Sequence, residues 1–395
     1  MFPNVKSKQK VLLISYEYGR RVTGGIGRVV NGIFNSMPKD ILFDIFVFKS
    51  PVQHVFESAY VYRKEGLNKA KCLYSGEYKK VFHTALKQEK YDVINITVGG
   101  PPVCWCIEEI KAYYPEVKII FSCHSIAKHE IGIRNNNPQD LELEEYIMNN
   151  VDHIHVLNKT SLKYLMKSYS FTVENKQVSV IANGIDEADF AAIDDGFKNN
   201  ILNQIDRAKD IVVLCLSRWS FGKGIEHLID AIPKVIQHNK NVKFIIAGRK
   251  AQSWENNVGE YVQMVDEKIQ SVSEYVIPLG WLDNSQRNAM FSIADICVMP
   301  SLLEYFPYGI LEPMICKVPI ISSNIDSVVE LLEGDKECLF FTPENSNALA
   351  EKLIYLISNK CKREELSTAA YKKVKEKYNF ESISRQYVSM YQSVV

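Results

Sequence analysis

Glu304 and Glu312 are two glutamates eight positions apart, and a pair of carboxylates can bind the hydroxyls of a polyol. They follow an apolar, strand-like run at residues 296–300, and a helix-like stretch runs through residues 313–316. A carboxylate accepts hydrogen bonds from neighbouring hydroxyls, such as those of a ribose or a hexose. Two acids at this spacing are also common by chance, as a helix cap and a helix-surface residue. The strand–loop–helix context favours a binding site.

The residues between the two glutamates add backbone donors. Phe306, Pro307 and Tyr308 lie in the loop that leads into the helix-like stretch. The first amides of a helix have no partner within the helix and carry part of its positive dipole. We therefore expect the backbone around residues 306–309 to face a phosphate or sugar oxygen.

Two cations, Arg218 and Lys223, occupy a glycine-containing loop after a buried strand predicted at residues 211–216. Arginine offers a fixed fork of donors and lysine a mobile point charge, and together they suit a diphosphate. Ordinary surface charges on a loop are the alternative. Open α/β sheets bind ligands beyond the carboxyl ends of their strands, which favours the diphosphate.

Two weaker signals lie in the first half of the chain. Gly24 and Gly25 precede a helix-like stretch and allow a close backbone approach, although the G-x-G-x-x-G spacing is absent and a plain turn is the alternative. His124 follows a strand predicted at residues 118–123. It suits a hydrogen bond to a sugar hydroxyl or the balancing of developing charge, and a structural histidine is the alternative.

Short apolar runs that alternate with helix-like stretches must position these residues. The predicted strands lie at residues 11–15, 43–48, 92–96, 118–123, 154–157, 178–181, 211–216, 243–247, 275–279, 296–300 and 318–322. Strands that are apolar throughout are typical of parallel sheets covered by helices on both faces. The pattern predicts an α/β fold of two Rossmann-like domains with parallel sheets, facing each other across a cleft.

A polar, acid-rich stretch at residues 184–210 marks the domain boundary. We expect a first domain at residues 1–185 and a second at 186–379. The last stretch, residues 380–395, is predicted as an amphipathic helix, because its apolar residues recur on one helical face. Those residues are Ile383, Tyr387, Met390 and Tyr391.

Composition and charge limit the partners. The chain has 47 Lys and Arg and 47 Asp and Glu, so nothing general favours nucleic acid. Residues 1–100 hold 16 basic and 8 acidic side chains, which fits a solvated surface better than an anionic membrane or acceptor, because the charges are scattered. The nine cysteines lack zinc-ligand spacing, so no metal is expected.

The sequence also carries expectations about location. No apolar run approaches the roughly 20 residues of a membrane-spanning helix, and no signal-peptide pattern opens the chain. We expect a cytoplasmic protein, and peripheral contact with the inner face of the membrane stays open.

Taken in order, these motifs resemble the retaining glycosyltransferases of family four, which have the GT-B fold. Glu304 and Glu312 match that family's E-x7-E motif. Further matching segments fall in the family's order: Gly24 with Gly25, His124, residues 180–186, Arg218 with Lys223, residues 279–282 and residues 294–301. The match covers nearly the whole chain, and the ordered set is more specific than any single piece.

The resemblance implies a donor site in the second domain. Arg218 and Lys223 would bind the donor diphosphate, and Glu312 would bind the nucleotide ribose. Glu304 and the backbone of residues 306–308 would hold the donor sugar.

The resemblance also implies roles for the first domain. His124 would contact the sugar near the reacting carbon. Gly24 and Gly25 would close over donor and acceptor, and the helix at residues 380–395 would cross back onto the first domain.

Enzymes of this family transfer a sugar with retention, usually without a metal, and use no cofactor besides the nucleotide-sugar co-substrate. UDP is their commonest donor nucleotide, so a UDP-sugar is expected. The chain departs from the family at Cys316-Lys317, where a small residue and glycine are usual, and at Arg249, where a glycine usually follows Gly248. The second departure leaves base recognition open.

Two alternatives to a UDP-sugar transferase stay open. One is another GT-B enzyme, such as a sugar-nucleotide epimerase or a phosphorylase, although their extra acids, histidines or cofactor lysine are not evident. The other is a non-catalytic subunit that binds nucleotide sugar. The acceptor is a carbohydrate, a lipid-linked glycan or a small metabolite, and its pocket is expected near residues 135–145 and the helix after Gly24.

Overall fold

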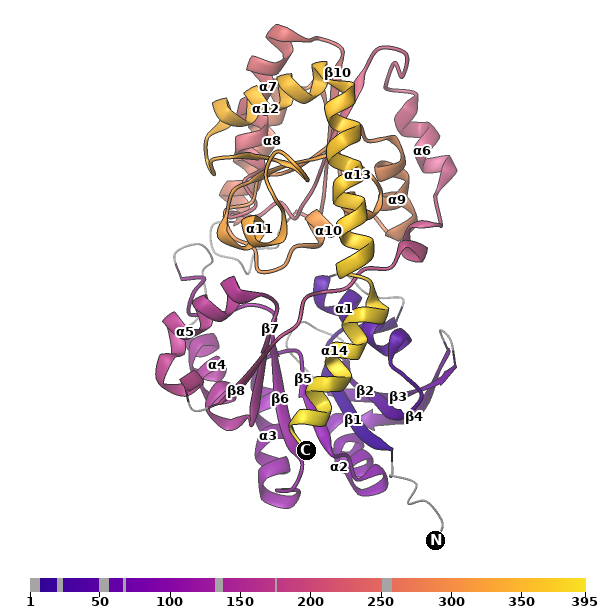
Figure 1. The fold of residues 1–395 in the computed structure, drawn as a ribbon, viewed down its shortest axis with the longest axis vertical. Coiled ribbons are helices and arrows are strands. Elements are labelled where there is room, and N and C mark those ends of the chain that lie inside the picture. Colours follow the sequence, from indigo (N-terminus) through magenta and orange to yellow (C-terminus); the bar gives the residue numbers. More distant parts are fainter. Residues whose placement is uncertain are drawn as a thin grey trace. The chain divides into compact units, whose positions relative to one another are not determined.

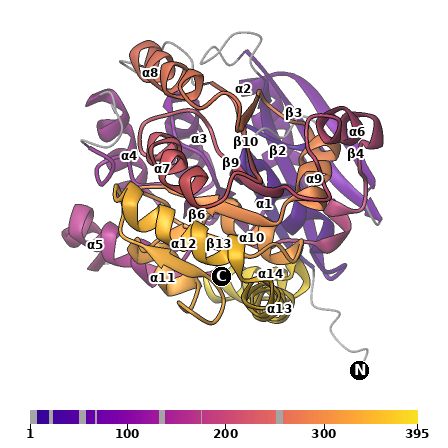
Figure 2. The same cartoon turned by 90° about the horizontal axis from the view of Figure 1, so that it is seen from above.

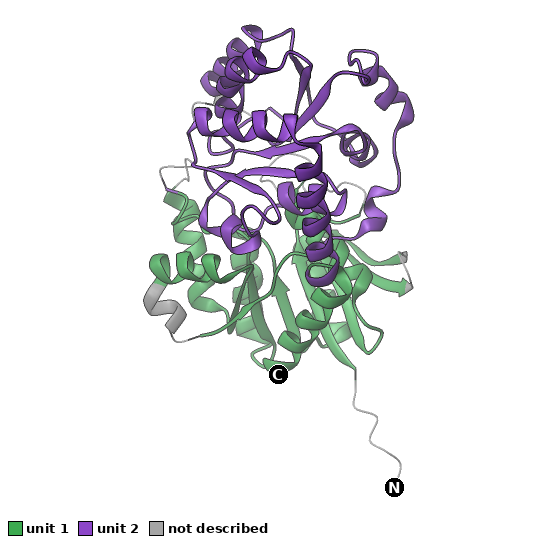
Figure 3. Ribbon diagram, turned by 45° about the horizontal axis from the view of Figure 1, so that its top comes forward, with its two compact units in different colours: residues 1–130, 136–184, 378–395 green, residues 131–135, 185–377 purple. Residues whose placement is uncertain are grey.

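The computed structural model describes residues 8–19, 24–49, 57–66, 69–131, 138–174, 176–250 and 258–395. The chain forms two compact units, coloured separately in Figure 3. Unit 1 comprises residues 1–130, 136–184 and 378–395, and unit 2 comprises residues 131–135 and 185–377. Each unit is an α/β body with its own sheet, which confirms the predicted fold class. The cleft between the domains stays a prediction.

Unit 1 is built on an eight-stranded sheet in the order β4-β3-β2-β1-β5-β6-β7-β8 (Figure 1). Its strands are β1 (Gln9–Ser15), β2 (Ile41–Lys49), β3 (Ser58–Gly66), β4 (Lys69–Glu77), β5 (Val93–Ile96), β6 (Lys118–Cys123), β7 (His153–Val156) and β8 (Gln177–Val180). Along the part of this order that runs β2-β1-β5-β6-β7-β8, neighbouring strands are parallel. At the other edge, β3 pairs antiparallel with both β2 and β4. The sheet is therefore mixed, because this hairpin extends the predicted parallel strands.

Helices cover both faces of the sheet of unit 1. They are α1 (Gly25–Ser36), α2 (Tyr78–Glu89), α3 (Pro101–Tyr113), α4 (Pro138–Asn150), α5 (Lys159–Glu174) and α14 (Phe380–Ser393). On one face Phe46 of β2 packs edge-on against Phe82 of α2. On the other face Phe43 of β2 contacts Phe34 of α1 and Tyr391 of α14. Successive strand residues point to opposite faces, so β2 anchors both layers.

The C-terminal helix α14 belongs to the core of unit 1. Its residues Ile383, Tyr387 and Met390 are buried, as the amphipathic pattern predicts. Its first residue, Phe380, packs so closely on α1 that a Cβ on Gly32 would lie 1.9 Å from the ring. The hydroxyl of Tyr391 accepts a hydrogen bond of 2.9 Å from the side-chain amide of Asn95 on β5.

Unit 2 contains a six-stranded, wholly parallel sheet in the order β11-β10-β9-β12-β13-β14. Its strands are β9 (Ile211–Leu216), β10 (Val242–Ala247), β11 (Val276–Leu279), β12 (Ile296–Met299), β13 (Ile320–Ser323) and β14 (Leu339–Phe341). The chain crosses from β11 at one edge to β12 beside β9 in the middle. Such a reversal of strand order is where doubly wound sheets bind ligands.

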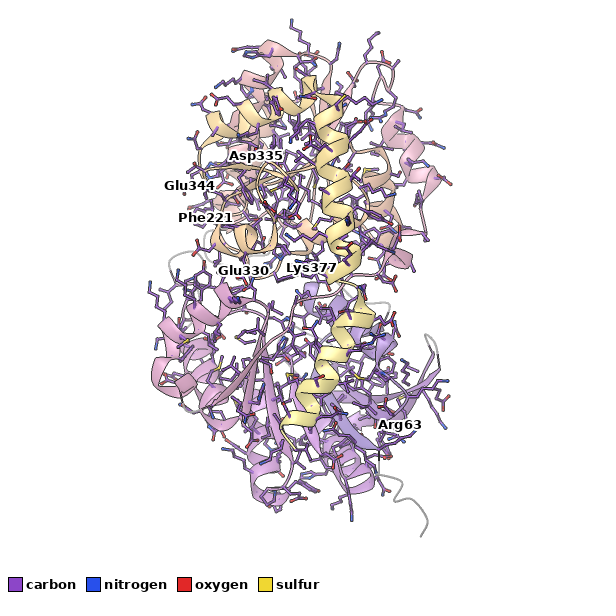
Figure 4. The ribbon with its side chains drawn as sticks, in the orientation of Figure 1. Arg63, Phe221, Glu330, Asp335, Glu344 and Lys377 are labelled. Carbon is purple, nitrogen blue, oxygen red and sulfur yellow. The ribbon has the colours of Figure 1, made fainter. Side chains whose placement is uncertain are left out.

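The helices of unit 2 form a layer on each side of its sheet (Figure 2). They are η2 (Glu187–Phe190), α6 (Asp195–Leu202), α7 (Ile225–His238), α8 (Val258–Gln270), α9 (Asn284–Ile293), α10 (Tyr308–Ile315), α11 (Asp326–Leu331), α12 (Ser346–Ser358) and α13 (Lys360–Lys377). Val213 and Cys215 of β9 join the apolar core under α7, α8 and α12. Val212 and Leu214, on the opposite face, join the core under α6 and α9. Lys377, labelled in Figure 4, ends α13 and unit 2.

Three further properties bear on the sequence expectations. Over the described ranges, no helix is both long and apolar enough to cross a membrane. Among the same residues, no group of three or more His, Cys, Asp or Glu side chains is arranged to hold a metal ion. All nine cysteines are free thiols, and only Cys72 and Cys361 are exposed.

Candidate functional site

The loops after β9 and β12 are joined through their backbones. The amide of Leu302 donates a 2.8 Å hydrogen bond to the carbonyl of Gly222. Gly224 has a φ of 66°, and a Cβ at this position would lie 2.0 Å from the carbonyl oxygen of Pro300. Only glycine permits both the left-handed backbone and this close approach. The loop that carries Lys223 is therefore held against the loop that leads to Glu304.

The end of β10 joins the same surface. Gly248 has a φ of 154°, and a Cβ there would lie 1.7 Å from the carbonyl oxygen of Ser217. The amide of Trp219 donates to the carbonyl of Arg249 at 2.9 Å. Three strand ends, those of β9, β10 and β12, thus form one continuous set of loops at the carboxyl edge of the sheet.

Lys223 and Glu304 meet on this surface. The distance from Lys223 Nζ to Glu304 Oε1 is 2.5 Å, and the hydroxyl of Ser301 donates to the same oxygen at 2.9 Å. Both charged side chains are mostly shielded from water, with exposed fractions of 14% and 16%. The structure therefore brings together two site residues that lie 81 positions apart in the sequence.

Arg218 lies in the same loop and is exposed. Its neighbour Trp219 is almost fully buried, so the backbone on one side of the arginine is anchored while its guanidinium remains at the surface. Phe221, labelled in Figure 4, follows in this loop with an exposed fraction of 54%. The loop thus presents a cation and an aromatic ring to solvent beside Lys223.

Two helices begin at these loops. Helix α7 starts directly after Gly224, and α10 starts at Tyr308, directly after Pro307. Neither Gly224 nor Pro307 caps its helix through a side-chain hydrogen bond. The N-terminal ends of helices carry partial positive charge and suit an anion. Phe306 and Pro307 are buried, which holds the start of α10 in place.

Glu312 lies inside α10 and forms an ion pair that the sequence analysis missed. Arg287 of α9 approaches it with 3.2 Å between Nη1 and Oε1. The guanidinium also donates to the side chains of Asn284 and Asn288 and lies 4.8 Å from the ring centre of Phe190. The only signal in the sequence is a charge among the apolar residues of an amphipathic helix.

This arrangement in unit 2 suits an anion. Arg218 and Lys223 supply two positive charges, and the starts of α7 and α10 add oriented backbone dipoles. Glu304 and Ser301 hold the lysine ammonium in one position, so its charge is oriented before a ligand arrives. Preorganised charges of this kind stabilise developing negative charge without reorganisation.

The remaining predicted site residues lie in unit 1. His124 follows β6, and burial, with a smaller contribution from His155, lowers its pKa to about 3, so the imidazole is neutral at pH 7. Gly24 precedes α1 and donates its amide at 3.1 Å to the carboxylate of Glu17, and Gly25 is the first residue of the helix. Their proximity to the residues of unit 2 stays a prediction.

Two family models together match most of the chain. The model described as Glycosyltransferase Family 4 matches residues 23–189. The model described as Glycosyl transferases group 1 matches residues 197–373. An uncharacterized glycosyltransferase of Methanocaldococcus jannaschii is 24% identical over 398 residues, covering 97% of each chain.

Solved structures share the fold. Sucrose-phosphate synthase from Thermosynechococcus elongatus superposes with a TM-score of 0.77 at 18% identity, over 98% of this chain and 99% of that one. HepE from Anabaena, in complex with UDP-glucose, superposes with a TM-score of 0.72 at 18% identity, over 97% of this chain and 99% of that one.

Proposed function

Because the chain belongs to the family 4 glycosyltransferases of GT-B fold, we propose that it moves a sugar from a UDP-sugar to an acceptor hydroxyl, with retention at the anomeric carbon and without a metal. The observation that carries this proposal is the group formed by Lys223, Glu304 and Ser301 beside the starts of α7 and α10. Lys223, Arg218 and the two helix starts offer positive charge for the diphosphate, and Glu304 offers a carboxylate acceptor for the hydroxyls of the sugar.

The choice of UDP rests on two kinds of support. HepE of Anabaena has the same fold and binds UDP-glucose. In this chain the carboxylate of Glu312, held by Arg287, suits the paired hydroxyls of a ribose. The ribose would then lie near α10, and the diphosphate would lie along Arg218 and Lys223.

The proposed transfer breaks one bond at the anomeric carbon and forms another on the same face. The acceptor oxygen forms a bond to the anomeric carbon on the face from which the diphosphate leaves, while the bond between that carbon and the diphosphate oxygen breaks. The bonding electrons leave with the diphosphate, and the acceptor proton passes to its departing oxygen. Lys223 and Arg218 stabilise the negative charge that grows on this leaving group.

The proposed metal independence is supported by the same two side chains. A divalent cation serves in many phosphate sites to neutralise the leaving diphosphate. Here Lys223 and Arg218 together supply two positive charges, and helix dipoles supplement them. Neutral His124 fits this scheme as a hydrogen-bonding group near the sugar, because its low pKa prevents it from carrying a competing positive charge.

Calorimetry with UDP, GDP and ADP in EDTA buffer tests the donor and the metal dependence. We expect UDP to bind most tightly and its affinity to be unchanged by EDTA. Preference for GDP or ADP, or loss of binding in EDTA, would overturn that part of the proposal.

The anomeric configuration is tested separately by proton NMR of the product. UDP-glucose and UDP-N-acetylglucosamine are offered with a panel of methyl and octyl glycosides as acceptors. Retention predicts an α-linked product from these α-linked donors, whereas a β-linked product would exclude it. A reaction without enzyme serves as the blank.

A further inference from the structure

Unit 1 contains a pocket whose lining includes none of the predicted site residues. Its cavity volume is about 330 Å3, and its main lining residues are Tyr16, Glu17, Tyr18, Lys49, Tyr60 and Tyr62. The first three directly follow β1, Lys49 ends β2, and the last two lie on β3. We call it the tyrosine pocket. Its volume falls at the lower end of the range for small-molecule sites, which is about 300–1,000 Å3.

The strand register places the tyrosines of β3 on one face of the sheet. Tyr60 pairs with Val47 of β2, and Tyr62 pairs with Ile45, so both rings project to the same side. The alternate residue Phe48 projects to the other side, where it packs edge-on against Tyr78 of α2. Tyr60 and Tyr62 therefore lie on the α1 side, at the hairpin edge of the sheet.

The rings form a continuous aromatic wall. Tyr60 and Tyr62 are stacked, with 6.0 Å between ring centres and 18° between planes. Tyr18 lies 5.2 Å from Tyr62, and its other neighbour, Phe34 of α1, contacts it edge-on. Burial, aided by Tyr62, raises the pKa of Tyr18 to about 12. At neutral pH the wall thus combines apolar ring faces with uncharged hydroxyls that donate and accept.

Two opposite charges frame this wall. Lys49 Nζ donates to the hydroxyl of Tyr60 at 3.2 Å and lies 5.4 Å from its ring centre. The carboxylate of Glu17 accepts the amide of Gly24 at the start of α1. An anionic ligand at this helix start would either displace the carboxylate of Glu17 or be repelled by its negative charge. The described residues that line the pocket therefore offer one positive and one negative hydrogen-bonding group, with no excess of positive charge among them.

A pyranose ring matches these features. One face of a pyranose carries several C–H bonds and packs on aromatic rings, while its hydroxyls at the rim need both donors and acceptors. Aromatic rings with a polar end suit a ligand that is apolar on one side and wet on the other. A phosphate-bearing ligand matches less well, because Glu17 already occupies the helix start.

We propose that the tyrosine pocket binds an uncharged pyranose of the acceptor, packed on Tyr60 and Tyr62 and hydrogen-bonded by Glu17 and Lys49. This identification of the ligand as acceptor rests on the proposed function. A free monosaccharide and the terminal sugar of a longer glycan present the same ring. The scattered positive charges of residues 1–100 then have no role in selecting an anionic acceptor.

Saturation-transfer NMR on the full chain tests the pocket without any donor. The probes are methyl α- and β-glucoside, methyl N-acetylglucosaminide, methyl maltoside and glucose 6-phosphate. We expect at least one neutral glycoside to bind, with a dissociation constant at least tenfold higher in the Tyr60→Leu/Tyr62→Leu variant. Tyr113→Leu, at an exposed tyrosine of α3, is the matched control and should bind as wild type. Stronger binding of methyl maltoside than of the monosaccharides indicates the end of a glycan as the source.

Charge selection is tested with Glu17→Gln. The proposal expects this variant to raise affinity for glucose 6-phosphate relative to methyl glucoside by at least threefold. Preference of the wild type for glucose 6-phosphate, or no glycoside signal that depends on Tyr60 and Tyr62, overturns the proposal. Calorimetry with UDP on the same samples separates the two conclusions. If the wild-type chain binds UDP but no glycoside, only the proposed ligand of the tyrosine pocket is contradicted. If it binds a glycoside but not UDP, only the proposed UDP donor is contradicted.

Discussion

Arg287 on α9 and Glu312 on α10 form a nearly buried ion pair, with exposed fractions of 8% and 6% for the two side chains. Taking two charges out of water is expensive, so such a pair contributes little net stability. Its consequence is geometric, because each side chain fixes the orientation of the other. The guanidinium thus sets where the Glu312 carboxylate, the proposed ribose ligand, can point.

Removing Arg287 is predicted to destabilise the protein strongly. In Arg287→Ala the carboxylate of Glu312 remains buried without its cation, which costs about 3–5 kcal/mol of unfolding free energy. Urea denaturation measures this loss. Arg207→Ala is the control, because its pair with Asp295 is 40% and 24% exposed and contributes at most about 1 kcal/mol. Equal losses in the two variants would show that the Arg287 pair is not shielded from solvent.

Glu312→Gln is predicted to weaken UDP binding by about tenfold, which corresponds to about 1.4 kcal/mol. The substitution keeps the volume of the side chain but replaces a charged acceptor with a neutral one. Calorimetry with UDP measures the change at a temperature where the variant is folded. Glu337→Gln, which alters another shielded glutamate in an ion pair of unit 2, should leave UDP affinity unchanged. Unchanged affinity in Glu312→Gln would contradict the ribose assignment.

Lys223→Ala is predicted to lower kcat for transfer by about 10²–10³-fold, the usual effect of removing one charge-stabilising donor. The fold should tolerate the change, because Lys223 lies in a loop. A product assay and the melting temperature report the two effects separately. Lys234→Ala breaks the ion pair with Glu351 on the surface of α7 and should retain wild-type turnover. Wild-type turnover in Lys223→Ala would remove the lysine from the mechanism.

The sequence predicts most of the parallel strands of both units, because most of them are apolar, but it misses the three-residue strand β14 of unit 2. The strands predicted at residues 118–123 and 211–216 match β6 and β9 in both bounds. The hairpin of β3 and β4 was missed, since Ser58–Gly66 alternates tyrosines with small and charged residues. Its strands are held by pairing with β2 at the edge of the sheet, which no local pattern indicates.

The candidate site shows a similar division. Lys223 and Glu304 could be proposed from the sequence, because each follows a recognisable strand. Their 2.5 Å contact could not be predicted, since it depends on the packing of two loops 81 residues apart. Arg287 and the tyrosine pocket were missed for the same reason: their partners are supplied by other elements. Family membership and the GT-B fold are confirmed, whereas the roles of the individual site residues stay predictions.

Gly248→Ala is predicted to cost about 1–3 kcal/mol, as expected for a clash in a packed region, and to reduce UDP affinity. The new Cβ would meet the carbonyl oxygen of Ser217 at 1.7 Å and displace the backbone next to Arg218. Urea denaturation and calorimetry measure the two effects. Gly280→Ala is a matched control, because a Cβ there meets no atom within 4 Å. Equal stability and equal UDP affinity in the two variants would show that the close approach of Gly248 to Ser217 does not position the loop after β9.

Acid is predicted to destabilise unit 1 through His124 and His155. Burial is the main cause that lowers the pKa of His124 to about 3 and that of His155 to about 4, against an ordinary value of 6.5. Between pH 6.5 and pH 4 the unfolded chain therefore binds protons that the folded chain does not. Stability falls as the pH drops through this window, by up to about 1.4 kcal/mol per pH unit for each histidine.

The variant His155→Gln tests this pH dependence. The imidazole of His155 donates from Nε2 to the carbonyl of Ile181 at 2.8 Å, and a glutamine amide can make the same bond. We expect the fall in unfolding free energy between pH 6 and pH 5, measured by hydrogen exchange of β6 and β7, to be smaller by about 1 kcal/mol in this variant. His238→Gln, at an exposed histidine of α7, should keep the wild-type slope. An unaltered slope in His155→Gln would mean that this imidazole takes up its proton equally in the folded and unfolded chain.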